Sequence, residues 1–295
     1  TDCIERILQN EQGKISDGEI VSFLTDLGKP PELVMICITC VDALLGTDME
    51  RVCRQAEETV QIPVRPCYMY ALTREGRRPP MVHVRQSLYE LLEPVEKKAA
   101  SMNLLGFFAP VTEEWELLRY LRRAGMKQIR EISRCENYRQ FLQMGEANFN
   151  LVLHPEARAA AGDLQERLGI PSIELTRVYQ TDKIHNQYQA LGKVLGISVD
   201  DQEDRHSAEA AVHNFMSRFG AVTISLGECL NADAFELALA MTRYGIHVAE
   251  IFGTLQQENY PWLRQLAQQS PDTRVYSNME PTMLYYDPSD RKVNL

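Results

Sequence analysis

The sequence predicts an α/β protein built from parallel sheets with helices on both faces. Short apolar runs alternate with longer amphipathic stretches from one end of the chain to the other, which is typical of doubly wound domains. The chain has 295 residues, a length that one hydrophobic core seldom serves, so we expect several domains. We therefore predict three Rossmann-like domains over residues 1–100, 101–200 and 201–295, with the first and the last incomplete in this chain.

The first domain is expected to contain two strands, each followed by a helix: strands at 33–38 and 64–70, helices at 48–60 and 84–100. The first strand is entirely apolar (LVMICI), as expected for a buried strand of a parallel sheet. Asp48 stands at the start of the first helix, where a carboxylate is favoured by the positive end of the helix dipole. The stretch 76–80 (GRRPP) indicates a loop before the second helix.

The middle domain repeats this plan with four strands, at 102–107, 127–132, 149–153 and 172–175. Its helices are expected after Thr112, at 138–144, at 155–168 and at 183–195. Thr112 is a good N-cap, and Gly125 is placed to end the helix that follows it. The helix at 155–168 starts at a proline and is followed by Gly169, which is the usual asymmetry of helix ends.

An acidic, polar stretch at 198–205 predicts a linker to the third domain. Beyond it we expect helices at 206–219, 232–244 and 261–269, and strands at 221–226, 247–252 and 274–277, with a further short element at 283–286. In such folds ligands bind beyond the carboxyl ends of the strands. Residues that directly follow a strand are therefore the first candidates for function.

Composition excludes several classes of function. The net charge is −10 and the basic residues are scattered, so we expect no nucleic-acid partner. The sequence has no apolar run near the ~20 residues that span a bilayer and no leader pattern after Thr1, which predicts a cytoplasmic protein with no membrane partner. The odd count of seven cysteines indicates reduced thiols, some of them possible metal ligands. Without a Walker A or a G-x-G-x-x-G motif, the chain itself should neither hydrolyse ATP nor bind a dinucleotide in those ways.

Cys40 is the clearest candidate for chemistry. It follows the strand at 33–38, where a soft thiolate at the carboxyl end of a strand could reach an iron–sulfur cluster. Cys37 and Cys40 have C-x-x-C spacing, but residues three apart on a strand point to opposite faces. We therefore expect Cys37 in the core and Cys40 leaving the strand. The alternative is that both are small buried hydrophobic residues.

The segment from Thr39-Cys40 to Gly46-Thr47-Asp48 resembles the Thr-Cys…Ile-Gly-Asp-Asp signature of the nitrogenase component 1 type family. That family includes nitrogenase subunits, scaffold proteins for its cofactor, and dark-operative protochlorophyllide reductase. Other segments resemble the family in the same order along the chain: Thr1-Asp2, Ile62-Pro63-Val64-Arg65, Asn103-Leu104-Leu105-Gly106, the Ala-x-x-Asn-Leu pattern of 147–151, Leu168-Gly169-Ile170-Pro171 and Thr181-Asp182. The order and spacing of these segments over residues 1–200 are more specific than any one of them.

The resemblance implies a redox role. In the family the cysteine of the Thr-Cys motif is a cluster ligand at a subunit interface, and Cys40 matches it. The cluster would be of the 4Fe-4S type, with the remaining ligands on segments that this sequence lacks, and no ligand role is carried onto Cys3. The implied partners are a homologous sister subunit or a second copy of the chain, and a separate ATP-hydrolysing iron–sulfur reductase that supplies electrons.

His154 is the second candidate, because it directly follows the strand at 149–153. In nitrogenase and its scaffold the matching position, four residues after the asparagine of Asn-Leu, is a cysteine that holds the iron–molybdenum cofactor or its precursor. A histidine can ligate metal or deliver a proton to a substrate. Its alternative role is to cap the helix that begins at Pro155.

Three functions remain open from the sequence. The first is a catalytic redox subunit, the second a non-catalytic scaffold for a metal cluster or tetrapyrrole, and the third a plain α/β protein that binds a small ligand with Cys40 inert. The basic loop with Arg74, Arg77 and Arg78 could contact an anionic substrate or an acidic partner, or could simply be solvated. His83 and Arg85 are equally open, and Cys67, Cys135 and Cys229 are expected to be core or surface thiols.

Overall fold

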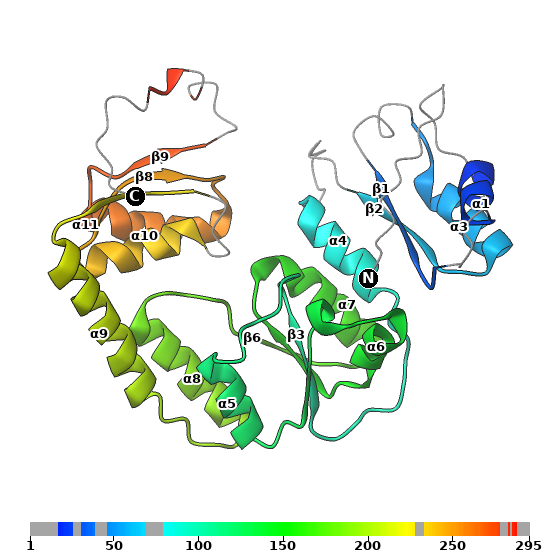
Figure 1. The fold of residues 1–295 in the computed structure, drawn as a ribbon, viewed down its shortest axis with the longest axis horizontal. Helices are drawn as coiled ribbons and strands as arrows, with labels where there is room; N and C mark the ends of the chain where they lie inside the picture. The colour runs from blue at the N-terminus through cyan, green and yellow to red at the C-terminus, as the bar shows by residue number, and fades with distance from the viewer. Residues whose placement is uncertain are drawn as a thin grey trace. The chain divides into compact units, whose positions relative to one another are not determined.

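The computed structural model describes residues 17–25, 31–38, 46–68, 79–227, 233–277, 283 and 285–287. Within them the strands form three separate sheets, and every strand pair is parallel (Figure 1). The chain divides into two units, one with residues 1–113 and 125–175, the other with residues 114–124 and 176–295. The predicted α/β class with parallel sheets is confirmed, and the boundaries at 100 and 200 stay a prediction.

The first sheet pairs β1 (Val34–Ile38) with β2 (Val64–Tyr68). Helices α1 (Asp17–Thr25) and α3 (Met49–Val60) share a core with one face of the sheet, where Ile38 and Val64 are buried. Asp48 is the N-cap of α3, and its carboxylate accepts a hydrogen bond from the amide of Arg51 at 3.1 Å. Helix α1 is not predicted from the sequence.

The helix predicted at 84–100 is wrong at both ends. Helix α4 spans Pro80–Tyr89, with Pro80 in the first turn, where the missing N–H of proline costs nothing. The residues after Tyr89 form turns and extended chain as far as β3. Pro94 explains the early end, because its ring disfavours the helical conformation of Glu93 and removes a backbone donor.

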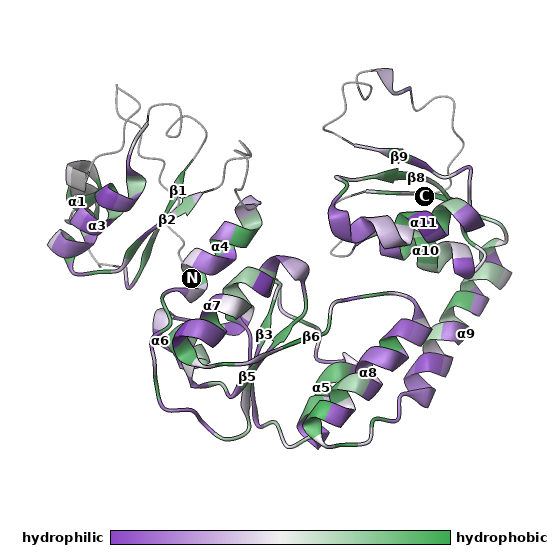
Figure 2. Cartoon of the chain, turned by 180° about the vertical axis from the view of Figure 1, so that it is seen from behind, coloured by the Kyte–Doolittle hydropathy of each residue, from purple (hydrophilic) through white to green (hydrophobic). Residues whose placement is uncertain are grey.

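The middle sheet has the strand order β4-β3-β5-β6. Its strands are β3 (Ser101–Leu105), β4 (Gln128–Arg130), β5 (Phe149–Val152) and β6 (Ser172–Glu174). The helical segments between them are α5 (Glu116–Arg123), η1 (Ile132–Arg134), α6 (Tyr138–Leu142), η2 (Gln143–Glu146), η3 (Pro155–Ala157) and α7 (Arg158–Leu168). Strand β3 is buried along its whole length, and the hydropathy colouring of Figure 2 shows mostly hydrophobic residues on it.

Thr112 does not cap α5, which begins at Glu116 with Trp115 at the cap position. The residues before α5 bond instead to Glu131 and Arg134. The carboxylate of Glu131 accepts from the amide of Val111 at 3.1 Å, and the guanidinium of Arg134 lies 3.0 Å from the carboxylate of Glu113. These bonds fix residues 111–113 beside η1 and delay the helix. Gly125 and Gly169 both adopt positive φ at the helix ends, as predicted.

The third sheet has the order β7-β8-β9, with strands Thr223–Leu226, His247–Phe252 and Arg274–Tyr276. The helices that follow β6 in the chain are α8 (Thr181–Leu195), α9 (Gln202–Phe219), α10 (Ala234–Arg243) and α11 (Tyr260–Gln269), with η4 at Gln257–Asn259, and they belong to the same unit as α5. Half of the linker predicted at 198–205 therefore belongs to α9. Among the described residues, none of the helices combines the length and hydropathy needed to cross a bilayer.

Candidate functional site

The middle sheet contains a topological switch point between β3 and β5. From β3 the chain moves to β4 on one side of the sheet, and then returns to place β5 and β6 on the other side. In open parallel sheets the connections diverge at such a point and leave a crevice outside the carboxyl ends of the two strands. The residues that follow β3 are Gly106 and Phe107, and those that follow β5 are Leu153 and His154. The fold therefore places His154 where ligands of this architecture bind.

The two strand ends lie very close together. The amide of Leu153 donates to the carbonyl of Leu105 at 2.7 Å. Gly106 has φ +144°, and a Cβ added to it would lie 2.8 Å from the backbone nitrogen of His154 and 2.9 Å from its Cβ. Only glycine fits both the backbone conformation and the space. The approach of these two turns fixes the position of His154.

Two asparagines deeper in the same strands hold them in register. Asn103 on β3 pairs with Asn150 on β5, and both side chains are fully buried. The Nδ2 of Asn103 donates to the Oδ1 of Asn150 and to the carbonyl of Met144, both at 2.9 Å. These asparagines belong to the two segments that resemble family motifs. Their contact gives those segments a structural role, since it locks the strands whose ends carry Gly106 and His154.

His154 caps the short helix η3. Its Nδ1 accepts a hydrogen bond from the amide of Glu156 at 3.3 Å, and its ring lies edge-on to the ring of Phe107 with centroids 5.7 Å apart. The capping role proposed as the alternative is therefore present. An Nδ1 that accepts requires the neutral ring to carry its proton on Nε2. Its side chain remains 30% exposed, so the cap leaves the ring accessible at the edge of the sheet.

Arg85 on α4 ties this edge together. Its guanidinium donates from Nε and Nη2 to the carbonyl of Gly106 at 3.0 and 2.6 Å, and from Nη1 to the carboxylate of Glu156 at 2.8 Å. Burial lowers the pKa of Arg85, and the charge of Glu156 opposes that effect. The guanidinium also stacks over the ring of Phe108, 4.7 Å from its centroid. Arg85 thus bonds to both turns of the switch point, which makes it a positioning residue for His154.

The carboxyl end of the first sheet is the second candidate region. Strand β1 ends at Ile38, two residues before Cys40. Cys40 itself lies outside the described residues, as do Cys3, Cys229 and the basic loop with Arg74, Arg77 and Arg78. On the far side of that gap Gly46 has φ +65° and Asp48 caps α3. The described residues place the chain on both sides of Cys40 at this edge, and the role of Cys40 stays a prediction.

The prediction that Cys37 lies in the core is wrong. Cys37 is exposed in this chain, whereas Ile38 is buried. The reason is the alternation of the strand, because the face covered by α1 and α3 takes Val34, Ile36 and Ile38. Cys37 therefore lies on the opposite face, beside Cys67 of β2, which is its partner in register.

Helix α4 links the two edges. It packs against β2 on one side and against α7 and η3 on the other. His83 of α4 contacts Tyr68, the last residue of β2, with ring centroids 6.2 Å apart. Two residues later Arg85 bonds to Gly106 and Glu156 at the end of the middle sheet. One helix thus carries a contact to each carboxyl edge, through two residues whose roles the sequence leaves open.

The described part of the chain supplies no complete metal site. No three His, Cys, Asp or Glu side chains among those residues are placed to hold a metal ion. A cluster bound through Cys40 would therefore need ligands from residues outside the described ranges or from another chain.

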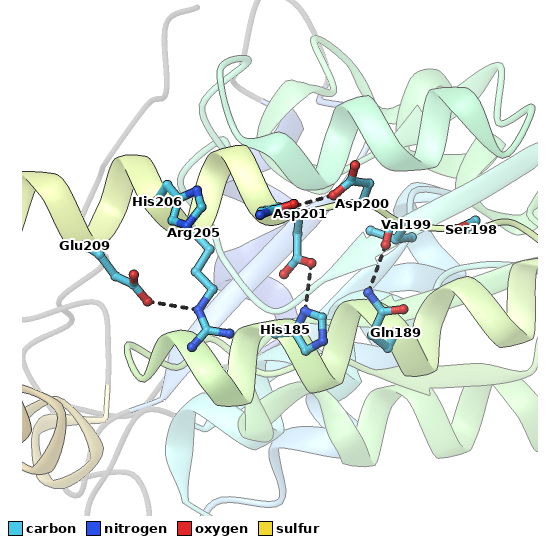
Figure 3. Close-up of a pocket in the computed structure, with 10 residues that line it drawn as sticks. His185, Gln189, Ser198, Val199, Asp200, Asp201, Arg205, His206 and Glu209 are labelled. Carbon is cyan, nitrogen blue, oxygen red and sulfur yellow. Dashed lines mark hydrogen bonds and ion pairs between the residues drawn. The ribbon is translucent and has the colours of Figure 1, made fainter.

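A separate hollow of about 730 Å³ lies between α8 and α9. Figure 3 shows His185 on α8 facing Asp201, and Arg205 beside Glu209 on α9. His185 Nδ1 lies 2.8 Å from Asp201 Oδ1, and Arg205 Nε donates to Glu209 at 2.9 Å. The His185–Asp201 pair bridges α8 and the start of α9, whereas Arg205 and Glu209 pair within α9. These charged side chains of the hollow are thus bonded to one another in pairs, and we do not place the functional site there.

Sequence reasoning misses Arg85 as the residue that organises the switch point. Its partners are far apart in sequence, with Gly106 21 residues and Glu156 71 residues away. One signal is present: Arg85 is the one charged residue in the α4 segment PMVHVRQSLY, which lies between two predicted strands, and an arginine that becomes buried needs acceptors. The contact between Asn103 and Asn150 is equally hidden in the sequence, although both asparagines belong to motif segments.

Comparison with known proteins agrees with this fold. The family model of nitrogenase component 1 type oxidoreductases matches residues 23–295. The nitrogenase iron-molybdenum cofactor biosynthesis protein NifE of Rippkaea orientalis is 27% identical over 148 residues, which are 49% of this chain and 32% of that protein. One subunit of the light-independent protochlorophyllide reductase of a Synechococcus species is 24% identical in an alignment of 275 positions that covers 83% of this chain and 51% of that protein.

Among solved structures, nitrogenase Cp1 at pH 6.5 superposes with a TM-score of 0.65 at 14% identity, over 91% of this chain and 64% of that chain. This likeness concerns the fold. The chain spans about a third of the NifE protein and about half of the reductase subunit. The resemblance read from the sequence is confirmed, and the chain belongs to the nitrogenase component 1 type oxidoreductase family.

Proposed function

We propose that the chain is a subunit of a nitrogenase-like oxidoreductase of the cytoplasm. Cys40 would help to hold an iron–sulfur cluster of the 4Fe-4S type at a subunit interface. A separate ATP-hydrolysing iron–sulfur reductase would supply electrons, which pass to a substrate or cofactor. The observation that carries this proposal is the alignment with the protochlorophyllide reductase subunit, which extends over 83% of the chain, more than the 49% aligned with NifE of R. orientalis.

The cluster would be shared. Cys40 is the one residue that matches a family ligand, so the remaining ligands would come from segments that this sequence lacks or from a homologous sister subunit or second copy. When bound, such a cluster stores and releases single electrons. On either side of Cys40 in the sequence, the described residues contribute β1, which ends at Ile38, and the Asp48 cap of α3.

His154 is proposed to face the substrate at the switch point of the middle sheet. In the neutral ring Nδ1 accepts from the amide of Glu156. Proton delivery uses the imidazolium form, in which Nδ1 is also protonated and lies 3.7 Å from the carboxylate of Glu156. That form donates the Nε2 proton to a bound molecule and is left as a neutral ring. Arg85 holds both turns in place through Gly106 and Glu156. The close approach of Gly106 to the backbone and Cβ of His154 leaves this turn little freedom to shift. The role of His154 is thus proton delivery from a fixed position.

A second function is favoured by the relatives that are named as iron-molybdenum cofactor biosynthesis proteins. In that case the same two edges would hold a metal cluster or a tetrapyrrole without turnover. The chain would then act as a scaffold, and His154 would be a ligand or a contact instead of a proton donor. The redox function and a metal-cluster scaffold both require Cys40 to bind the cluster, and they differ in whether electrons pass through the subunit.

The test is anaerobic expression of the chain, alone and with a co-expressed sister subunit, followed by measurement of iron and acid-labile sulfide per chain. We expect stoichiometric iron and sulfide in the wild type and loss of both in Cys40→Ala. Cys37→Ala is the matched control, because Cys37 is a cysteine at the end of the same strand with an exposed side chain, and it should keep its iron. Absence of iron in the wild type, even with the sister subunit, would leave a plain ligand-binding α/β protein.

A further inference from the structure

Cys37 and Cys67 lie side by side on the first sheet. They are partners in register on two adjacent parallel strands, so their side chains project from the same face. Cys37 is exposed and Cys67 is 4% exposed. Neither cysteine matches a family ligand, and the proposed function does not use them.

The two thiols interact directly. Burial, the charge of Cys37 and a hydrogen bond with the Cys37 side chain raise the pKa of Cys67 to about 12. Cys53, the other buried thiol near this sheet, lies in the core on the opposite face with α3. Cys37 and Cys67 are therefore a pair set apart from the hydrophobic core that contains Cys53.

The backbone geometry permits a disulfide between them. Neighbouring strands lie about 4.8 Å apart, within the range of about 4.4–6.8 Å between the Cα atoms of disulfide-bonded cysteines. In-register residues on parallel strands keep their Cβ atoms about as far apart as the strands, whereas a relaxed disulfide has them about 3.5–4.5 Å apart. Closure therefore requires the strands to draw together slightly. Such a strained bond is reduced readily, as in regulatory disulfides.

We propose that Cys37 and Cys67 are a reversible thiol–disulfide site, which small-molecule disulfides of the glutathione class oxidise. Cys37 is the exposed thiol and reacts first: its thiolate attacks one sulfur of oxidised glutathione, forms a mixed disulfide and releases one reduced glutathione. The mixed disulfide removes the Cys37 thiol, one of the causes that raise the pKa of Cys67. Cys67 then loses its proton, its sulfur attacks the sulfur of Cys37, and the second glutathione leaves as a thiol. The two cysteines lose two electrons and two protons in total, and one oxidised glutathione becomes two reduced molecules.

The site has a structural consequence for the first sheet. The bond would tie β1 to β2 at their carboxyl ends, three residues before Cys40. Oxidation would thus change the strand end that precedes Cys40 in the sequence. The thiol chemistry itself does not depend on whether Cys40 binds a cluster, so it can be tested without iron.

The experiment treats the reduced, iron-free chain with oxidised glutathione, blocks the remaining thiols with an alkylating reagent, and maps the tryptic peptides by mass spectrometry. Trypsin leaves Cys37 and Cys40 on residues 15–51 and Cys67 on residues 55–74. We use the Cys40→Ser variant, in which a cross-link between these peptides can come only from Cys37 and Cys67. In the wild-type chain, fragment ions from between Cys37 and Cys40 locate the bond independently.

We expect the cross-linked peptide in both proteins, its complete loss in Cys37→Ser and in Cys67→Ser, and its disappearance when excess reduced glutathione is added. Cys53 should stay reduced throughout, since the core covers it. A Cys37–glutathione adduct that persists without any cross-link would overturn the proposal, as would a bond that joins Cys67 to Cys40 in the wild type. Because the measurement follows thiols alone, its failure leaves the cluster proposal untouched, and the reverse also holds.

Discussion

The carboxyl edges of the first and the middle sheet differ in the kind of evidence that marks each of them as a candidate site. At the middle sheet, Gly106 meets His154, Arg85 bonds to both turns, and a buried asparagine pair holds the strands beneath. At the first sheet, the described residues give the strand before Cys40 and the cap after it. The middle edge is built by packing within one chain, whereas the first edge precedes a family signature whose cysteine we propose as one ligand of a shared cluster. The comparison teaches that a site can be fixed by geometry or by sequence signature, and that the two kinds call for different tests.

Substitution of Gly106 should do the most damage to the middle edge. Gly106→Ala combines an unfavourable positive φ with a Cβ 2.8 Å from the backbone nitrogen of His154, and we expect a loss of about 2–5 kcal/mol in the free energy of unfolding. Gly162→Ala is the control, because nothing lies within 4 Å of its Cβ in α7, and it should stabilise by about 0.5–1 kcal/mol. Urea denaturation followed by circular dichroism measures both. Equal stabilities of Gly106→Ala and wild type would refute the close approach.

Removal of the Arg85 guanidinium should have the next largest effect. Arg85→Met keeps much of the side-chain volume but leaves the carbonyl of Gly106 and the carboxylate of Glu156 without this donor, which we expect to cost about 2–3 kcal/mol. Arg158→Met breaks an exposed pair with Glu174 and should cost less than about 1 kcal/mol. Hydrogen exchange of the β3 and β5 amides would assign the loss to the middle sheet. If both variants lose the same stability, Arg85 does not organise this edge.

The asparagine pair should contribute less, and its two members should not be additive. Asn103→Leu leaves the buried Oδ1 of Asn150 and the carbonyl of Met144 without their donor, for an expected loss of about 1–2 kcal/mol. Adding Asn150→Leu removes the unpaired Oδ1 of Asn150. The double variant should therefore lose less stability than the sum of the two single losses. Chemical denaturation of the four proteins gives the coupling directly, and strict additivity would mean that the two side chains do not depend on each other.

A change at His154 can separate its two roles with almost no effect on stability. Asparagine is among the best N-caps, so His154→Asn should stay within about 0.5 kcal/mol of the wild type. It removes the ring that we propose as proton donor, and turnover in the assembled complex should fall about 100-fold or more. His213→Asn, an exposed histidine of α9, should change neither quantity. Unchanged turnover in folded His154→Asn would reduce His154 to a helix cap.

Much of the fold could be predicted from the sequence, because apolar runs and helix caps are local signals. The predicted bounds of strand β8 are those of the structure, and the Asp48 cap and the Gly169 helix end are in place. The errors come from contacts distant in sequence. Glu131 and Arg134 bond to Val111 and Glu113, and the helix expected after Thr112 begins only at Glu116.

The candidate site was predictable to a smaller extent. His154 followed from its place after a strand, and the fold puts it at the switch point of the middle sheet. The role of Arg85 could not be assigned, because it depends on the carbonyl of Gly106 and the carboxylate of Glu156, which only the fold brings close to it. Cys37 was expected on the wrong face because an all-apolar strand carries no alternation that shows which face the helices cover.

The most direct test of the central claim is electron uptake by the assembled protein. The chain would be purified anaerobically with its sister subunit, loaded with iron and sulfide, and mixed with the reductase of its own assembly in the presence and absence of ATP. Electron paramagnetic resonance would follow the reduction. We predict a reduced iron–sulfur signal that requires ATP and the reductase and that Cys40→Ala abolishes while Cys37→Ala retains it. Iron bound through Cys40 that shows no ATP-dependent reduction would contradict the redox role and identify the chain as a scaffold.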